Sequence, residues 1–310
     1  MHTILGANGV VGQELSRALA GNHTAIRQVS RNPQKVNPTD DTFTADLLDA
    51  EATANAVAGS EVVYLLAGLK YDVSVWQAQW PRVMRNVIDA CTRHGARLVF
   101  LDNVYAYGQV EGAMTEETPF NPISKKGEVR AKIASMLLDE ISSGNLQAMI
   151  ARSADFYGPK VTNSFPHATV FSRLAAGKAP QWIGDPDKVH TFTYVPDIGS
   201  AIALLGRTPQ AYGQTWHLPT SKERLSGADF VRLACELSGQ ACKLQVAPRW
   251  LLGLMALFVP VLRENREMMY QFDNDYCFDS SKIESAYGLQ ATDYRKGISD
   301  ALQAMMQKAV

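Results

Sequence analysis

The chain opens on a glycine-rich turn, Gly6-Ala7-Asn8-Gly9-Val10-Val11-Gly12. This turn follows a short apolar run that ends at Leu5, and it leads into a helical pattern over residues 10–20. Glycines at this spacing let a backbone turn sharply and approach a pyrophosphate, while the amides at the helix N-terminus face the phosphate charge. The turn predicts a dinucleotide-binding loop; a tight strand-to-helix turn without a ligand is the alternative interpretation.

The pattern beyond this turn alternates between apolar runs and helical stretches as far as about residue 157. Runs typical of buried strands cover residues 25–30, 61–67, 97–101 and 146–152. Helical patterns cover residues 51–58, 76–94 and 126–141. Strands that alternate with helices indicate βαβ units and a parallel sheet. We therefore expect an α/β fold with a parallel sheet.

After residue 157 helical patterns predominate. The length of 310 residues exceeds that of a usual single domain. We expect a dinucleotide-binding domain over residues 1–157 and a smaller, mainly helical lobe over residues 158–310. The chain is expected to be partly interwoven between the two.

Composition narrows the function classes. Lys and Arg total 30 and Asp and Glu total 31, a net charge of −1, so nucleic-acid binding has no electrostatic support. The four cysteines form neither a C-x-x-C motif nor a cluster with histidine, so neither a metal site nor a disulfide framework is indicated. Four scattered thiols are typical of a reducing cytoplasm, where we expect this protein to be.

No targeting segment or membrane span is indicated. The N-terminal residues lack a basic region followed by an apolar run, so they do not resemble a signal peptide. The longest apolar stretch, residues 250–262, is interrupted by Gly253 and Pro260 and is shorter than the roughly 20 residues that a bilayer requires. It is more typical of a buried helix or of a lid over a pocket.

The end of the second predicted strand bears on the choice of cofactor. Folds that bind NAD place a carboxylate there for the ribose 2′-hydroxyl. This chain has Ser30-Arg31 instead, which suits a 2′-phosphate and favours NADP over NAD. The alternative is that Arg31 is a solvated loop residue. Further along, Asp46 precedes a helix, where it would either accept from the adenine amino group or cap the helix.

Motifs along nearly the whole chain resemble those of the extended short-chain dehydrogenase/reductase superfamily, and within it the NAD-dependent epimerase/dehydratase family. The matching segments after the glycine turn are Ala45-Asp46-Leu47, residues 62–68, Val104-Tyr105-Ala106-Tyr107-Gly108, residues 155–159, residues 192–197, residues 279–282 and Tyr287-Gly288-Leu289. The resemblance implies that residues 1–157 form an NAD(P)-binding Rossmann domain with a doubly wound parallel sheet and that residues 158–310 form the substrate-binding lobe. It also implies that later motifs bind the cofactor, through Asp46, Leu47, Ala67, Gly68, Lys132 and Tyr157.

The chain departs from this family where the chemistry is expected. The family uses a tyrosine four residues before a lysine as general acid/base, a serine or threonine at the preceding strand end, and an asparagine in the long helix. Here Lys132 matches the lysine, but Glu128 stands four residues before it. Asn103 takes the place of the serine and Trp80 that of the asparagine. Ordinary tyrosine–lysine chemistry is therefore not expected, and the chain resembles an atypical member.

Two other residues are candidates for the acid/base. Tyr105 occupies a place where family members that dehydrate sugars carry an acidic residue facing the substrate, and Asp102 lies close by. The alternatives are that Tyr105 forms the wall of a pocket and that Asp102 caps a loop. With Asn103 and Lys132, these residues make up the candidate catalytic set.

Three residues are candidates for substrate contact. Trp80 lies in the long predicted helix, and His190 lies where the family lines its substrate site, although the sequence slightly favours a structural histidine. Arg130 belongs to a basic patch with Lys125 and Lys126. That patch is either solvated or binds a phosphorylated or carboxylated substrate.

Two functions remain open. The first is an NADP-dependent reductase, epimerase or dehydratase for a small hydroxyl or carbonyl substrate, with nucleotide sugars among the candidates. The second is a non-catalytic NADP-binding sensor that has lost turnover. In both cases we expect a monomer or homodimer with a small-molecule partner.

Overall fold

The computed structural model describes residues 1–21, 24–247 and 264–306. Its contacts divide the chain into two compact units. The first comprises Met1–Ala106, Lys125–Ser153 and Ile198–Leu218. The second comprises Tyr107–Ser124, Ala154–Asp197 and Pro219–Val310. The assignment of cofactor binding to residues 1–157 and of substrate binding to residues 158–310 stays a prediction.

The first unit is built on a parallel sheet, which has seven strands among the described residues, in the order β11-β7-β5-β4-β1-β2-β3. The strands are β1 (His2–Leu5), β2 (Ile26–Ser30), β3 (Asp41–Thr44), β4 (Val62–Leu65), β5 (Arg97–Asp102), β7 (Ala148–Arg152) and β11 (Thr215–His217). The order reverses beside β1, because β2 and β4 flank it, with Ile26 and Val62 both opposite His2. Ligands of such sheets bind at the carboxyl ends of the strands near this reversal.

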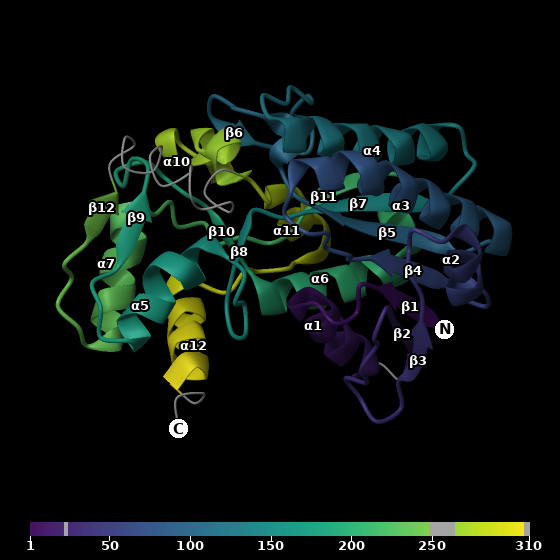
Figure 1. Cartoon of the computed structure of the whole chain (residues 1–310), viewed down its shortest axis with the longest axis horizontal. Coiled ribbons are helices and arrows are strands. Elements are labelled where there is room, and N and C mark those ends of the chain that lie inside the picture. Colours follow the sequence, from purple (N-terminus) through teal and green to yellow (C-terminus); the bar gives the residue numbers. More distant parts are fainter. Residues whose placement is uncertain (22–23, 248–263, 307–310) are drawn as a thin grey trace. The chain divides into compact units, whose positions relative to one another are not determined.

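Helices cover both faces of this sheet. They are α1 (Val10–Ala20), α2 (Ala50–Val57), α3 (Val73–His94), α4 (Lys125–Ser142) and α6 (Val195–Arg207). Figure 1 shows α2, α3 and α4 on one face and α1 and α6 on the other. All residues of β4 are buried as a result, as expected for a strand that is covered on both sides. The predicted doubly wound parallel fold is confirmed.

Two elements differ from the sequence-based expectation. Helix α3 begins three residues earlier than its apolar pattern, because the Asp72 side chain caps it by accepting from the amides of Ser74 and Val75. Strand β11 lies within residues 158–310, which were assigned to the second lobe, but it pairs with β7 at the edge of the main sheet.

The second unit combines short helices with three two-stranded parallel sheets among its described residues. Its strands are β6 (Ala113–Met114), β8 (Asp155–Tyr157), β9 (Gln181–Ile183), β10 (Phe192–Tyr194), β12 (Gln245–Ala247) and β13 (Cys277–Phe278). Its helices are α5 (Ser172–Ala175), α7 (Gly227–Ser238), α10 (Tyr270–Asp273), α11 (Ser281–Tyr287) and α12 (Tyr294–Met306). An aromatic core that includes Tyr157, Trp182 and Phe230 holds them together.

The apolar stretch of residues 250–262 lies outside the described residues. Among the helices that the structure does describe, none combines the length and the apolar character needed to cross a bilayer.

One close helix contact sets the position of α1. At Gly199 of α6, an added Cβ atom would lie 2.7 Å from the backbone carbon of Glu14 and 2.8 Å from the amide nitrogen of Leu15. Because α1 follows directly on the glycine turn, the approach that Gly199 permits also places that turn.

We predict that Gly199→Ala lowers the free energy of unfolding by about 1–3 kcal/mol, since the new methyl group must push α1 away. The matched control is Gly21→Ala at the end of α1. There the backbone is right-handed and the nearest atom to an added Cβ lies at 3.7 Å. That substitution should leave stability unchanged or raise it by up to about 1 kcal/mol. Urea unfolding followed by circular dichroism measures both, and equal stabilities of the two variants would contradict the packing argument.

Candidate active site

Two of the three glycines in the turn are required by the packing of the chain itself. Gly6 has a φ of +91°, and a Cβ atom there would lie 2.5 Å from the Cα atom of Ala67, which follows β4. A Cβ atom on Gly12 would lie 2.7 Å from the carbonyl oxygen of Ala7. These glycines therefore bring the turn, the start of α1 and the end of β4 close together.

Gly9 is different. It is the exposed N-cap of α1 with an extended backbone, and the nearest atom to an added Cβ is the Gly6 carbonyl oxygen at 3.4 Å. The packing of the chain does not require a glycine here, so the missing side chain leaves open space at the helix N-terminus. The amides of the first helical turn, those of Val10, Val11 and Gly12, have no acceptor within a helix. This arrangement fits a pyrophosphate.

The loop after β2 is tied to the glycine turn. The Asn8 side chain donates to the Asn32 carbonyl oxygen at 2.7 Å, and the Ser30 hydroxyl accepts from the Asn32 amide at 3.1 Å. Arg31 is exposed, and its side chain makes no hydrogen bond or ion pair among the described residues. The guanidinium predicted to hold a 2′-phosphate thus lies on a loop that the glycine turn positions.

A polar network that the sequence did not reveal fixes the far end of this loop. The Asp40 carboxylate is buried and accepts from the Gln28 side chain at 2.7 Å and from the amides of Val36 and Asn37 at 3.0 and 2.9 Å. Burial acts to raise the pKa of Asp40, but the hydrogen bonds from Asn37 and Gln28 outweigh it and hold the pKa below its usual value. No periodic pattern marks these residues, since they come from a strand and a loop.

The other predicted adenine-side residues lie around the ends of β3 and β4. Asp46 is exposed and accepts from the Leu48 amide at 3.0 Å. The cap of α2 is Asp49, which accepts from Ala52, so the capping alternative for Asp46 was wrong. Leu47 is half-buried, as is Ala67, while Gly68 is exposed. Contact of Asp46, Leu47, Ala67 and Gly68 with a cofactor stays a prediction.

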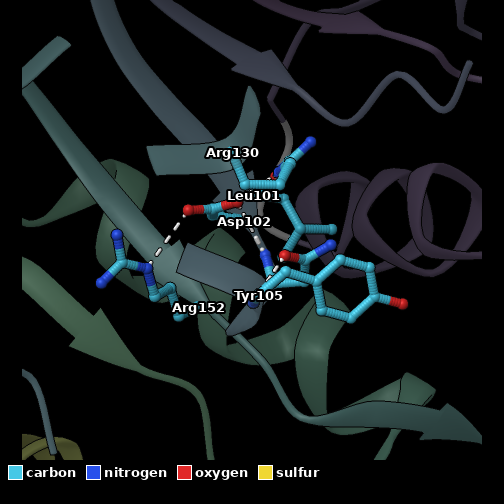
Figure 2. Close-up of polar contacts among 6 residues, drawn as sticks. Leu101, Asp102, Tyr105, Arg130 and Arg152 are labelled. Atoms are coloured by element: carbon cyan, nitrogen blue, oxygen red, sulfur yellow. Dashed lines mark hydrogen bonds and ion pairs between the residues drawn. The ribbon is translucent and has the colours of Figure 1, made fainter. Parts of the chain in front are cut away.

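The carboxylate of Asp102, at the end of β5, lies between two arginines (Figure 2). It accepts from Nε of Arg130 on α4 at 2.7 Å and from Nε of Arg152 at the end of β7 at 3.2 Å. The Asn103 amide donates to it at 2.8 Å. The Asp102 side chain is fully buried. Both carboxylate oxygens are engaged, so this geometry fits an anchor for the two guanidiniums better than a group that exchanges protons with a substrate.

Helix α4 corrects the predicted match to the family lysine. Lys132 and Glu128, which were matched to the lysine and the tyrosine, are both exposed. The buried face of α4 carries Lys126 and Arg130 instead. These two residues have the same four-residue spacing, which places them on one side of the helix. The predicted match is therefore displaced by two residues, and Lys132 does not point inward as a ribose-binding residue would.

The sequence did contain a signal for this register. The residues Val129, Ile133, Ala134 and Leu137 recur at helical spacing and define the buried face of α4. Lys126 and Arg130 fall on that same face. Basic residues on an otherwise apolar helix face are unusual, and the interpretation of a solvated basic patch holds only for the exposed Lys125.

Aromatic rings surround the Arg130 guanidinium. Its central carbon lies 4.7 Å from the centre of the Trp80 ring, 5.1 Å from that of Phe100 and 5.9 Å from that of Trp76. Trp80, predicted to contact substrate, is therefore a buried wall beside Arg130. Such contacts between a cation and ring faces are attractive, and more so where water is excluded.

Tyr105 stacks on Trp76 with ring centres 6.3 Å apart, and its ring points away from Asp102 (Figure 2). The Asn103 side chain accepts from the Tyr105 amide at 3.0 Å, so it shapes the turn after β5. Tyr105 and Asp102 thus lie near each other in the chain but do not act on one point. A catalytic role for Tyr105 or for Asn103 stays a prediction.

Two predicted site residues belong to the second unit. The Tyr157 side chain, predicted to bind the cofactor, is fully buried in the aromatic core between Phe192, Tyr194 and Phe230. This corrects the prediction for its side chain. His190 is also buried, stacked between Phe272 and Tyr276 at 4.6 and 4.4 Å, with Nε2 3.0 Å from the Asp155 carboxylate. That environment favours a structural histidine, and its role toward a substrate stays a prediction.

We predict that Asp102→Asn lowers the free energy of unfolding by about 3–5 kcal/mol, because two buried guanidiniums lose their shared counter-charge. Glu128→Gln on the exposed face of α4 is the control, and its effect should stay within about 0.5 kcal/mol. Urea unfolding measures both. An Asp102→Asn variant with unchanged stability would instead point to a chemical role for this carboxylate.

Comparisons with known proteins agree with this architecture. The model of the NAD dependent epimerase/dehydratase family matches residues 2–218. The dTDP-glucose 4,6-dehydratase of Mycobacterium tuberculosis is 26% identical over 185 residues, which span 54% of this chain and 54% of that protein. The uncharacterized UDP-glucose epimerase YtcB of Bacillus subtilis is 24% identical over 217 residues, which span 67% of this chain and 68% of that protein. The match thus spans about half the length of the first relative.

Solved structures share the fold along almost the whole chain. The crystal structure of gox2253 has a TM-score of 0.83 at 19% identity and covers 99% of this chain and 98% of that one. The Thermus thermophilus UDP-glucose 4-epimerase in complex with NAD has a TM-score of 0.81 at 18% identity and covers 100% of both chains. Since the family model spans most of the chain, this protein belongs to the NAD-dependent epimerase/dehydratase family.

Proposed function

We propose that this protein is an NADP-dependent enzyme that oxidises or reduces a hydroxyl- or carbonyl-bearing carbon of a small molecule, with nucleotide sugars as the first substrates to test. The observation that carries the proposal is the open space at Gly9 beside the first-turn amides of α1. The chain's own packing explains Gly6 and Gly12 but not Gly9, and a pyrophosphate accounts for it.

We expect the reacting atoms of cofactor and substrate to lie at the carboxyl end of β5. The carboxyl ends of parallel strands lie on one edge of a sheet, so the turns after β1 and β5 share that edge. A nicotinamide dinucleotide supplies hydride transfer when it is bound. The chain's own residues would then orient the substrate and move a proton. The tyrosine that the family resemblance implies for this proton transfer is missing here.

Two residues are candidates for this proton transfer. Tyr105 offers a phenol beside Trp76, at the end of β5. Lys126 offers an ammonium group on the inward face of α4, with Nζ 4.6 Å from the centre of the Tyr71 ring. Asp102 is committed to the two arginines, so we assign it to positioning Arg130 rather than to proton transfer.

The second candidate function is a sensor that binds NADP without turnover. The observation in its favour is that the inward face of α4 carries Lys126 and Arg130 at the spacing where the resemblance to the family implies a tyrosine and a lysine. One experiment distinguishes the two functions. The purified protein is denatured, any retained dinucleotide is identified by mass, and the protein is then incubated with dTDP- and UDP-sugars. A product that differs from its substrate supports the enzyme, and tight binding without a product supports the sensor.

A cytoplasmic location and a monomeric or homodimeric state stay predictions.

We predict that Gly9→Asp abolishes dinucleotide binding without unfolding the protein, because its carboxylate would occupy the open space at the helix N-terminus. Gly9→Ala should fold and keep most of its affinity, since an added Cβ has an ordinary contact distance of 3.4 Å. Calorimetric titration with NADP, alongside circular dichroism, tests both variants. Undiminished binding by Gly9→Asp would refute the placement of the cofactor.

We predict that Arg31→Ala weakens NADP binding about tenfold to a hundredfold and leaves NAD binding unchanged. A charge-assisted hydrogen bond contributes about 1.5–3 kcal/mol, and about 1.4 kcal/mol corresponds to one decade of affinity. Lys35→Ala is the control, because this cation lies on the same loop and donates to the Pro38 carbonyl oxygen. The UDP-glucose 4-epimerase structure of similar fold contains NAD. The affinities for NADP and for NAD are therefore both measured, in the wild type and in each variant. Equal affinities of the wild type for both cofactors would contradict the assignment.

A further inference from the structure

We propose that the cluster formed by Arg130, Trp76 and Trp80 binds an oxyanion of the carboxylate or phosphate type. The inference rests on the proposed function in one respect: it takes this oxyanion to be part of the substrate. The binding site itself is argued from the polarity of the cluster, and it would exist whether or not the protein turns a substrate over.

The unmatched polar atoms of this cluster are all hydrogen-bond donors. In the described part of the chain, Nε1 of Trp76 and Nε1 of Trp80 are buried without a partner. The hydrogen bonds of Arg130 use Nε and Nη2, and Nη1 makes none among the described residues. Tryptophan and arginine side chains donate and do not accept. A group that satisfies them must therefore be an acceptor, which excludes a cation.

The contacts of Arg130 position its guanidinium to bind such a group. Its Nε and Nη2 face Asp102, while Nη2 has a second, long contact of 3.4 Å with the Leu101 carbonyl oxygen. Nη1 is thus left over, beside an Nη2 group whose contact with Leu101 is long. The Trp80 ring lies 4.7 Å from the guanidinium carbon, and only 5% of the side chain is exposed. A fixed and largely dehydrated guanidinium edge matches the two oxygens of a carboxylate or phosphate.

Charge favours an oxyanion over a neutral hydroxyl. The Arg130 side chain carries a positively charged guanidinium with N–H donors in a planar fork. Lys126 adds an ammonium group to the same aromatic shell, because it lies over Tyr71, whose ring centre is 5.6 Å from that of Trp76. Hydrogen bonds from charged donors to charged acceptors are about twice as strong as neutral ones. The substrate class that follows is an acid, such as a sugar acid or a phosphorylated sugar.

The experiment measures the binding of two small probes, acetate and inorganic phosphate, without dinucleotide. Tryptophan fluorescence is followed as each probe is titrated to about 100 mM, with sodium chloride of equal ionic strength as the reference. We expect a saturable change with at least one probe and none with chloride. The tighter probe identifies the substrate group as carboxylate or phosphate. Absence of any saturable change would overturn the proposal.

Conservative variants locate the site. Arg130→Lys keeps the positive charge but loses the guanidinium edge, and Trp80→Phe keeps the ring but loses the indole N–H. We expect the first to weaken binding about tenfold or more and the second by a smaller factor. Trp182→Phe is the control, since this buried tryptophan of the second unit also has an Nε1 without a partner among the described residues. Equal probe affinities in all these variants would overturn the site, and if Arg130→Lys does not fold, Trp80→Phe and Trp76→Phe still decide it.

One further variant separates this inference from the proposed function. Gly9→Asp should bind the probe as the wild type does while it loses NADP. If the wild type binds NADP but no oxyanion, and Trp80→Phe weakens NADP, the cluster serves the cofactor and the proposal is wrong. If the oxyanion binds but no sugar acid or phosphorylated sugar is converted, the oxyanion site stands and the enzymatic function fails.

Discussion

The buried carboxylate of Asp102 holds together the part of the first unit that carries the candidate active site. It joins the end of β5 to α4 through Arg130 and to the end of β7 through Arg152. A buried charge is tolerated only when it is paired and hydrogen-bonded, so the three elements must keep this relative arrangement. The inward direction of Arg130, its position on the Trp80 ring and the register of α4 all depend on this one contact.

A different constraint shapes the turn after β1, where the limiting factor is space rather than charge. Gly6 and Gly12 allow backbone segments to approach more closely than a side chain permits, and Gly199 does the same for α6 against α1. Gly9 serves no such purpose. The chain therefore combines glycines that its own packing requires with one that leaves room for a ligand. This combination is what the proposed cofactor site requires, whereas α4 lacks the tyrosine that the resemblance to the family implies.

Much of the fold was predictable because its signals are local. The glycine turn, the apolar runs of β4 and β5 and the helical pattern of α1 each reflect interactions within a few residues. Strand β3 was not predicted, since Asp41–Thr44 is exposed or half-buried and carries no apolar run. The place of β11 at the sheet edge was also missed, because strand pairing over more than 60 residues leaves no local trace.

The sequence by itself determined three features of this protein. The chain starts with a strand, a glycine turn and a helix, it continues in alternating βα units, and it lacks the tyrosine that the family resemblance implies. It also contained the spacing of four between basic residues on α4. Only the tertiary structure decided that Lys126 and Arg130 face inward and that Lys132 does not, and that the Tyr157 side chain lies in a core. The physical reason is that spacing fixes which residues share a helix face, whereas burial depends on what packs against that face. For Arg130 the deciding partner is Asp102, which lies 28 residues away in the chain.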